Sequence, residues 1–485
     1  MQKIQNYING ELAAPVNNHY LDNFEPATGK VYSLIPESDI SDLELAVNAA
    51  EQAQQSWAEL PSEQRSTLLM KLADAIEAAS DELAKAEAID NGKPIAFARA
   101  VDSYRSAANI RFFASAATQF SSECHDMGAV GVNYTLRQPI GIVGCISPWN
   151  LPLYLFTWKI APALASGNCV IAKPSEVTPM TAYIFSRLCI EVGIPKGVIN
   201  ILHGSGPSIG APLVAHQKIK AISFTGGSAT GRAIASTIAP MLKKFSLELG
   251  GKNPTLVFAD SCNSKSDLEK VVSEVARAAF SNQGQICLCG SRIYIEQSIY
   301  EEFKNKFVKT IEQLKIGDPL DETTQHGALV SEQHRDKVYS YIELAKEEGG
   351  SILTGGNKIT IEGRCANGYF IEPTVIEGLS SDCRVNQEEI FGPVCTIQPF
   401  DSEKEVLLKA NGTEYGLATS IWSSDISRCH RLSSQLDFGI VWINTWLLRD
   451  LRTPFGGMKS SGMGREGGLE AMRFFTEPKN VCIKY

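Results

Sequence analysis

The chain lacks any apolar run that approaches the roughly 20 residues needed to cross a membrane. Its first six residues also lack the apolar core of a secretory signal. Lysine and arginine number 45 against 54 aspartate and glutamate, which gives a net charge of −9. Because this balance provides no basic field for phosphate groups, the sequence predicts a cytoplasmic protein that binds neither nucleic acid nor membranes.

Histidine is scarce as well, with seven residues spread along the chain. The twelve cysteines include no Cys-x-x-Cys pair, and the pattern nearest to a metal motif is Cys287-Leu288-Cys289. Because structural zinc sites need four clustered ligands, no metal is expected. Thiols scattered through a long chain are typical of a reducing compartment and not of a disulfide framework.

What the chain does contain is the composition of a globular protein, with 485 residues of which 44% are hydrophobic and 20% charged. This length predicts two or three domains. An amphipathic helix is expected over residues 62–84. From residue 141 onward, short apolar segments alternate with helical periodicity, which predicts parallel βαβ units and an α/β fold. The expected strands are 141–146, 169–172, 198–202, 219–224, 292–296 and an exposed one within 474–485; the expected helices are 158–165, 178–192, 271–280 and 300–314.

Two glycine-containing turns, at residues 204–206 and 226–231, follow expected strands. Parallel sheets bind nucleotides at the carboxyl ends of their strands, where phosphate groups meet helix N-termini. Neither turn has the Gly-x-Gly-x-x-Gly spacing, and glycines after strands often form turns and nothing more. Spacing alone leaves both interpretations open.

The most informative segment is 280–287, a polar, glycine-containing stretch that ends at Cys287. A cysteine thiolate is both a nucleophile and a leaving group, and an upstream carboxylate such as Glu248 can act as a base toward water. This pair suits covalent acyl chemistry, in which a thioester forms and is hydrolysed. The alternative is that Cys287 is a buried structural cysteine and Glu248 an ordinary surface carboxylate.

Seven motifs resemble, in their order along the chain, those of the NAD(P)-dependent aldehyde dehydrogenases, and the resemblance extends from about residue 7 to the C-terminus. They are Ser147-Pro148-Trp149-Asn150, Lys173-Pro174-Ser175-Glu176, Phe224-Thr225-Gly226-Gly227, Glu248-Leu249-Gly250-Gly251-Lys252, Gly284-Gln285-Ile286-Cys287, Glu389-Ile390-Phe391-Gly392-Pro393 and Pro454-Phe455-Gly456-Gly457.

The resemblance implies the α/β fold of aldehyde dehydrogenases, in three parts. These are a Rossmann-type NAD-binding domain (residues 1–120 and 140–247), an α/β catalytic domain (248–466) and a small β oligomerisation arm (121–139 and 467–485). Through this arm, self-association as a homodimer or homotetramer is expected.

The resemblance also implies roles for individual residues. Cys287 matches the nucleophile, which adds to the aldehyde carbon to give a thiohemiacetal. The side-chain amide of Asn150 and the backbone N–H of Cys287 match the donors to its oxyanion. Without the resemblance, a turn residue is the favoured interpretation of Asn150. Hydride transfer to the nicotinamide leaves a thioester, and Glu248 activates the water that hydrolyses it. Relatives that pass the acyl group to coenzyme A generally lack this glutamate.

NAD is the cofactor that the resemblance implies. Lys173 and Glu176 match the residues that hold the adenosine ribose, and a carboxylate there repels the 2′-phosphate of NADP. Glu389 and Phe391 match the pair that positions the nicotinamide ribose and ring. Gly227 stands where many relatives have serine, which removes a side chain that could contact a phosphate. The expected cofactor contacts are Ile146, Ser147, Trp149, Lys173, Glu176, Gly206, Gly210, Phe224, Gly226, Gly227, Gly231, Leu249, Glu389 and Phe391.

The segment 446–457 closely resembles the corresponding segment of the 2-aminomuconate and 2-hydroxymuconate semialdehyde dehydrogenases. In that subgroup, arginines that match Arg449 and Arg105 hold the distal carboxylate and the 2-oxo or enamine end of the substrate. A partly desolvated arginine is costly unless it meets an anion, and its planar group suits a carboxylate. The alternatives are that Arg449 pairs with Asp450 and that Arg105 is a solvated helix charge. Expected walls of the substrate tunnel are Leu151, Leu155, Trp158 and Phe455.

The predicted activity is therefore NAD-dependent oxidation of 2-aminomuconate or 2-hydroxymuconate 6-semialdehyde, in tryptophan or aromatic-ring catabolism. An alternative is oxidation of uncharged apolar aldehydes such as retinal, which leaves the two arginines without a partner. A remote alternative is a non-catalytic structural protein on the same scaffold. The presence of Cys287, Glu248, Asn150, Lys173 and Glu389 counts against the latter.

Overall fold

The computed structural model describes residues 1–485. It contains two large sheets whose central strands run parallel, and helices cover each sheet. The first sheet has the strand order β24-β12-β11-β8-β9-β10-β2-β3. Its five central strands are parallel, and β8 and β9 are buried along their whole length, as continuous apolar runs predict. The predicted strands in this part are confirmed. The strand bounds are β2 Asn6–Ile8, β3 Glu11–Ala13, β8 Ile142–Ile146, β9 Cys169–Lys173, β10 Ile199–Ile201, β11 Ile219–Thr225, β12 Lys244–Glu248 and β24 Gly462–Met463.

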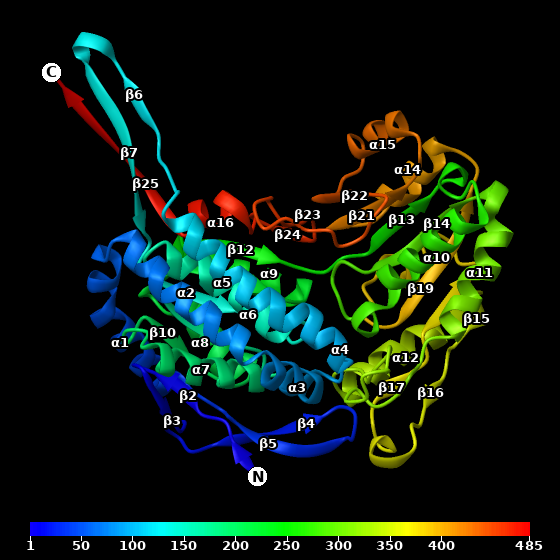
Figure 1. Cartoon of the computed structure of the whole chain (residues 1–485), viewed down its shortest axis with the longest axis horizontal. Helices are drawn as coiled ribbons and strands as arrows, with labels where there is room; N and C mark the ends of the chain where they lie inside the picture. Colours follow the sequence, from blue (N-terminus) through cyan, green and yellow to red (C-terminus); the bar gives the residue numbers. More distant parts are fainter.

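The helices around this sheet include three that pack side by side, α2, α5 and α6 (Figure 1). The single helix expected over residues 62–84 is wrong in extent, because the chain leaves the helical conformation at Ala79 and α3 begins at Ser80. Both helices pack on α7, and α2 also packs on α5. Apolar periodicity does not reveal a one-residue break. The bounds are α1 Ile40–Glu59, α2 Ser62–Ala78, α3 Ser80–Asn91, α5 Tyr104–Ala117, α6 Pro152–Ala165, α7 Met180–Val192, α8 Ala211–Ala215 and α9 Ser228–Ile238.

The second sheet has the order β15-β18-β19-β14-β13-β21-β22, and only β15 runs antiparallel to its neighbour. Helix α10 starts at Lys265, before the expected residue 271, because Ser264 caps a polar first turn that apolar periodicity does not detect. No helix is long and apolar enough to span a membrane. The bounds are β13 Asn253–Val257, β14 Gly290–Glu296, β15 Ser351–Thr354, β18 Thr374–Glu377, β19 Val394–Phe400, β21 Ala418–Trp422, β22 Ile440–Ile443, α10 Lys265–Phe280, α11 Tyr300–Glu312, α12 Glu332–Glu347, α14 Glu403–Asn411 and α15 Ile426–Ser433.

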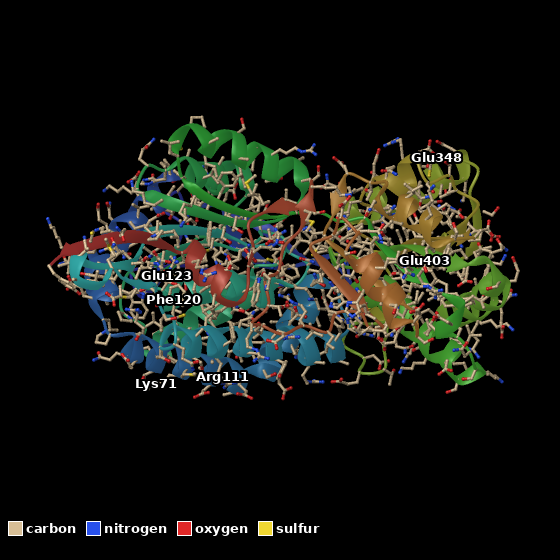
Figure 2. All side chains as sticks on the ribbon, turned by 90° about the horizontal axis from the view of Figure 1, so that it is seen from above. Lys71, Arg111, Phe120, Glu123, Glu348 and Glu403 are labelled. Carbon is tan, nitrogen blue, oxygen red and sulfur yellow. The ribbon has the colours of Figure 1, made fainter.

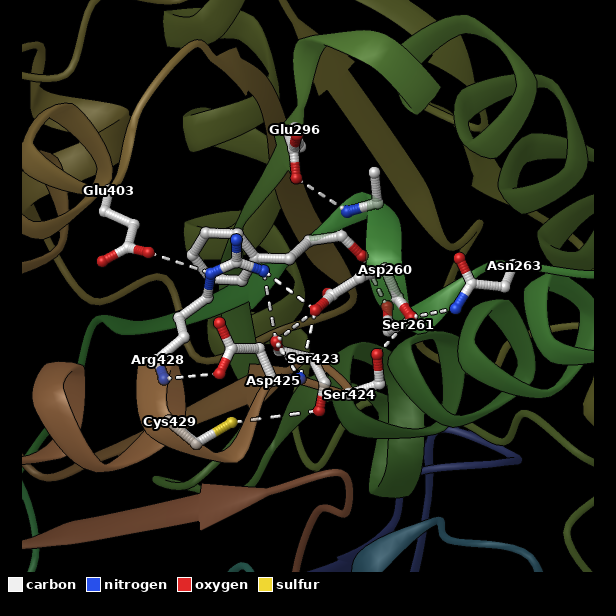
Figure 3. Close-up of polar contacts among 12 residues, drawn as sticks. Asp260, Ser261, Asn263, Glu296, Glu403, Ser423, Ser424, Asp425, Arg428 and Cys429 are labelled. Atoms are coloured by element: carbon white, nitrogen blue, oxygen red, sulfur yellow. Dashed lines mark hydrogen bonds and ion pairs between the residues drawn. The ribbon is translucent and has the colours of Figure 1, made fainter.

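At the carboxyl ends of β13 and β21, a polar network centred on Asp260 ties the strands to their covering helices (Figure 3). One oxygen of Asp260 accepts a hydrogen bond from the Ser423 hydroxyl at 2.9 Å and forms an ion pair with Arg428 at 3.0 Å. Arg428 also pairs with Glu403 on α14 at 3.0 Å. This far end of the second sheet is therefore occupied by a structural cluster.

Three strands project from the body as an arm (Figure 1). They are β6 Cys124–Asp126, β7 Gly131–Pro139 and β25 Thr476–Lys484, and β25 pairs with β7 along its whole length. The exposed strand predicted in the tail is thus confirmed. An ion pair of 3.2 Å joins Arg137 on β7 to Glu123, the residue before β6, which Figure 2 labels. Helix α16 (Gly468–Phe474) is not part of the arm sheet and packs against α6.

The fully buried Arg292 on β14 generates a prediction about stability. Its guanidinium donates to the carbonyls of Lys252 at 2.9 Å, Lys409 at 3.0 Å and Ala410 at 2.9 Å, so it caps the last turn of α14. We expect Arg292→Met to lower the free energy of unfolding by about 3 kcal/mol, because buried carbonyls lose their donors. Urea unfolding followed by tryptophan fluorescence measures this loss. The control Arg384→Met, at an exposed ion pair with Glu388, should leave the unfolding midpoint unchanged, and equal losses in both variants would contradict the interpretation.

Candidate active site

The candidate site lies where the carboxyl edge of the first sheet meets the amino edge of the second. Glu248 is the last residue of β12, and Cys287 lies shortly before β14 begins. The cysteine loop is turned by Asn282 and Gln283, which both have left-handed φ values of 51° and 56°. The Asn253 amide donates to the Cys287 carbonyl at 2.7 Å. The structure therefore brings the two predicted catalytic residues to one junction.

Asn150 joins this junction from the first sheet. Its side-chain amide donates to the Gln285 carbonyl at 2.9 Å, two residues before Cys287, and its own carbonyl accepts from the Asn282 amide at 2.9 Å. An amide nitrogen carries two hydrogens, and the second hydrogen of Asn150 has no partner in the structure. This geometry leaves one N–H beside Cys287 for an oxyanion.

Glu248 is buried, and neither of its carboxylate oxygens has a hydrogen-bond partner. Burial, and then the nearby charge of Glu466, raise the pKa of this carboxyl group well above its ordinary value. Glycine is required at position 456, because a Cβ there would lie 2.8 Å from a Glu248 oxygen. A carboxylate poised in this way can take a proton from water when the site is hydrated.

Burial also raises the pKa of the Cys287 thiol, and the negative charges of Glu389 and Glu248 add to this effect. Arg449 acts in the opposite direction on both Cys287 and Glu248. The positive charge of Arg449 therefore lies close enough to stabilise the ionised form of both groups.

A cleft of about 680 Å³ opens at the carboxyl ends of β8 and β11, where the strand order of the first sheet reverses. Open parallel sheets bind nucleotides at this point. Lys173 forms an ion pair of 3.0 Å with Glu176 at its wall. The cleft brings together ten of the predicted cofactor residues: Ile146, Ser147, Trp149, Lys173, Glu176, Gly206, Gly210, Phe224, Gly226 and Gly227.

Two features of this cleft fit a dinucleotide. The buried Ser147 hydroxyl has no hydrogen-bond partner. Gly227 is the N-cap of α9 and provides no side-chain cap, so the first N–H groups of that helix are free for an anion. Lys173 and Glu176 present a donor and an acceptor that suit ribose hydroxyls.

The other four predicted cofactor residues lie outside the cleft lining. A Cβ on Gly231 would meet Leu249 at 2.4 Å, so these two pack against each other. Glu389 accepts a hydrogen bond from the Gly251 N–H at 2.9 Å, and Glu389 and Phe391 share a small cavity with Cys287. The ring of Phe391 meets that of Trp149 at 5.2 Å, which connects this cavity to the cleft.

His334 is a residue that the sequence analysis missed. Its imidazole contacts the Phe391 carbonyl at 2.7 Å, and its ring lies 5.1 Å from that of Trp149. Phe391 has a left-handed φ of 61°, a strained state that persists only when its surroundings enforce it. Burial lowers the pKa of His334 to about 4, so the ring is neutral at physiological pH. No sequence pattern links two residues that lie 57 positions apart.

Lys93 is a second missed residue. This fully buried side chain pairs with Asp102 at 3.0 Å and Glu87 at 3.5 Å, and it donates to the Asn150 carbonyl at 3.0 Å. Burial raises the pKa values of both carboxyl groups. The Asn150 carbonyl oxygen therefore accepts from both the Lys93 ammonium and the Asn282 amide of the cysteine loop.

The structure also decides how Arg449 is paired. Its guanidinium lies over the rings of Trp158 at 4.8 Å and Phe455 at 4.0 Å, and it donates to the Tyr154 hydroxyl at 2.7 Å. It has no carboxylate partner. The alternative pairing with Asp450 does not occur, because Asp450 forms its ion pair with Arg452 at 2.6 Å.

Arg105 is half-buried and has no hydrogen bond or ion pair. Three residues before it in the sequence, Asp102 accepts from Lys93, which also donates to the Asn150 carbonyl. Four residues after it, the Asn109 amide donates to the Tyr154 carbonyl at 3.0 Å. These contacts join the start of α6 to α5 and the turn before it, whereas no hydrogen bond or ion pair connects Arg105 itself to the site. Of the predicted walls, Leu151, Trp158 and Phe455 are buried and Leu155 is half-buried.

Comparisons with known proteins agree with this geometry. Residues 14–481 match the model of the "Aldehyde dehydrogenase family". The chain belongs to the aldehyde dehydrogenase family. It is 48% identical to 2-aminomuconic semialdehyde dehydrogenase of Danio rerio, over 99% of this chain and 98% of that protein. It is 43% identical to 2-hydroxymuconic semialdehyde dehydrogenase of Pseudomonas sp. (strain CF600), over the full length of both.

Among solved structures, the NAD+ complex of an aldehyde dehydrogenase from Bacillus cereus matches with a TM-score of 0.96 and 38% identity, over 100% of this chain and 97% of that one. The predictions of the family, of an aldehyde dehydrogenase activity and of the α/β fold are therefore confirmed. The resemblance to the muconate semialdehyde dehydrogenases is confirmed as well.

The burial of Cys287 leads to a prediction about its reactivity. In the cofactor-free protein, the rate of alkylation of Cys287 by iodoacetamide should keep rising above about pH 8.5, because its thiolate fraction is small at neutral pH. Mass spectrometry of the labelled peptides measures the rate for each cysteine, and the exposed Cys124 and Cys482 serve as internal references. A rate for Cys287 that is already maximal at neutral pH would contradict the raised pKa.

Proposed function

We propose that this aldehyde dehydrogenase oxidises a semialdehyde that carries a carboxylate a few carbons from the aldehyde, with NAD as cofactor. 2-Aminomuconate and 2-hydroxymuconate 6-semialdehyde are the expected substrates. The observation that carries the proposal is Arg449, which is half-buried beside the catalytic groups and has no carboxylate partner. A buried cation without a counter-ion is costly, and a substrate carboxylate provides that counter-ion.

The reaction begins when the Cys287 thiolate adds to the aldehyde carbon. The carbonyl oxygen becomes an oxyanion, which accepts hydrogen bonds from the free N–H of the Asn150 amide and from the Cys287 backbone. Arg449 favours the thiolate. The buried Lys93 cluster keeps the Asn150 backbone in place, so little reorganisation is needed as the charge develops.

NAD, when bound, accepts the hydride that leaves the reacting carbon. Lys173 and Glu176 would hold the adenosine ribose, the first N–H groups of α9 would donate to the pyrophosphate, and Glu389 and Phe391 would hold the nicotinamide end. His334 keeps Phe391 in its left-handed conformation.

Glu248 acts in the second half of the reaction. Its carboxylate takes a proton from water, and the hydroxide attacks the thioester carbon. The carbon–sulfur bond then breaks, which returns the Cys287 thiolate and releases the carboxylic acid. The overall balance is aldehyde, NAD+ and water to acid, NADH and a proton.

Uncharged aldehydes are the second candidate, supported by the apolar rings of Trp158 and Phe455. An uncharged chain would pack against these rings but would leave Arg449 and Arg105 without an anion, so the carboxylated substrate is favoured. A non-catalytic role is disfavoured, because Cys287, Glu248 and Asn150 meet at one junction.

The arm is the proposed site of self-association as a homodimer or homotetramer. Strands β25 and β6 are its two edges, and an unpaired edge strand is suited to pairing with a second chain.

The test of the substrate is the rate of NADH formation from 2-hydroxymuconate 6-semialdehyde and from hexanal, with NAD in excess. A higher kcat/KM for the carboxylated aldehyde supports the proposal. Equal values, or a preference for hexanal, would leave the cysteine chemistry in place and overturn the substrate assignment.

The role of Arg449 generates a sharper prediction. Arg449→Gln should lower kcat/KM for 2-hydroxymuconate 6-semialdehyde by about 30-fold more than for hexanal, because a charge-assisted hydrogen bond to the carboxylate is lost. The weaker support of the Cys287 thiolate lowers kcat/KM for both aldehydes alike. The matched control is Arg452→Gln, since Arg452 is exposed and paired with Asp450. An equal loss with both aldehydes would show that Arg449 does not bind the carboxylate.

Variants of the two neighbouring cysteines distinguish the nucleophile from a structural thiol. We expect Cys287→Ala to abolish NADH formation and Cys289→Ala largely to retain it, because Cys289 is buried and its thiol contacts the Ser281 carbonyl at 3.9 Å. Steady-state assays at matched protein concentration measure both. Equal losses would remove the assignment of Cys287.

A further inference from the structure

Tyr154, on the first turn of α6, is the only hydrogen-bond partner of Arg449. Its hydroxyl oxygen accepts from the Arg449 guanidinium at 2.7 Å. Only 5% of Tyr154 is exposed, so this phenol is withdrawn from bulk water. A tyrosine at this position was not among the residues that sequence patterns pointed to.

The phenol has unused donor capacity. A tyrosine hydroxyl has one O–H donor as well as lone pairs, and here the lone pairs face Arg449 while the O–H donates to no protein atom. A buried donor without an acceptor is unfavourable by itself. Arg449 likewise has N–H groups without an acceptor in the protein. Free donors of Tyr154 and Arg449 therefore lie next to each other, and no Asp or Glu side chain pairs with Arg449.

The backbone of Tyr154 is fixed from a neighbouring helix. Its carbonyl accepts from the Asn109 amide at 3.0 Å and from the Thr157 hydroxyl at 3.0 Å. Asn109 lies on α5, which packs along α6 (Figure 1). Burial of the ring and the hydrogen bond to Arg449 hold the phenol itself in place, so little side-chain entropy is lost when it binds a ligand.

Tyr154 also lies near the reacting groups. Its partner Arg449 lies 4.0 Å from the centre of the Phe455 ring, and the next residue, Gly456, packs against the Glu248 carboxyl group. An aldehyde held at Cys287 and Asn150, with a carboxylate a few carbons away, would thus bring that carboxylate to Arg449 and Tyr154.

From this geometry we propose that the Tyr154 O–H donates a hydrogen bond to the substrate carboxylate that pairs with Arg449. Tyr154 is then a specificity-determining residue, and it selects carboxylated over neutral aldehydes by direct contact. The inference rests on the function proposed above. The carboxylate would accept one hydrogen bond from the phenol and at least one from the guanidinium. The hydrogen bond between Arg449 and Tyr154 holds the two donors next to each other.

The experiment compares Tyr154→Phe with the wild-type enzyme on 6-oxohexanoate and on hexanal, which have the same length and differ in the carboxylate. The variant keeps the ring and removes only the hydroxyl. We expect KM for 6-oxohexanoate to rise about tenfold, with little change in kcat and little change in either constant for hexanal. Turnover of hexanal also shows that the variant is folded. Tyr183→Phe, at a buried tyrosine of α7 that does not contact Arg449, is the matched control.

A second comparison separates direct contact from positioning of Arg449. Tyr154→Phe is combined with Arg449→Gln; a further rise in KM for 6-oxohexanoate in this background supports a direct hydrogen bond. An unchanged KM in the single variant, or no additional effect in the double variant, would overturn the proposal. A wild-type enzyme that does not prefer 6-oxohexanoate over hexanal would instead refute the proposed function, and this result is read before any variant is made.

Discussion

Two reciprocal hydrogen bonds, from Asn150 to the Gln285 carbonyl and from Asn282 to the Asn150 carbonyl, join the two sheets at the candidate nucleophile. Asn150 belongs to the first sheet and the cysteine loop to the second, so neither half of the molecule contains the site alone. The buried Lys93 cluster adds a third contact to the same backbone. These three contacts hold Asn150 against the loop of the candidate nucleophile.

The junction concentrates charged and polar groups that lack partners. Both oxygens of Glu248 are unpaired, and burial raises the pKa values of Glu248 and Cys287. Such groups cost stability, and perturbed titratable groups in a cleft are typical of catalytic sites. The compensation comes from elsewhere in the fold, for example from the fully satisfied Arg292 in the second sheet. Close approach of backbone and carboxylate depends on glycine at 456 and also at 250, where a Cβ would lie 2.4 Å from a Glu389 oxygen.

Much of the architecture could be predicted from local sequence. Strands such as β8 and β9 are continuous apolar runs between glycine-containing turns, and their type follows from that pattern. Helix ends were less predictable, since the break at Ala79 and the capped first turn of α10 interrupt no apolar period. Among functional residues, Lys93, His334 and Tyr154 were not predicted. Each acts through a partner distant in sequence, and no short motif records such a contact.

The sequence by itself determined the chemistry that the chain can perform: a cysteine in a polar, glycine-containing loop, a glutamate before two glycines, and alternating strands and helices that place a cleft at a sheet edge. Only the tertiary structure decided which charges are satisfied. Asp450 could have paired with either neighbouring arginine, and the fold gives it to Arg452 while Arg449 meets Tyr154, 295 positions away. The reason is physical, because the pairing of a charge depends on burial and on neighbours brought together by packing. An arginine left without an acid is therefore visible only in the folded protein.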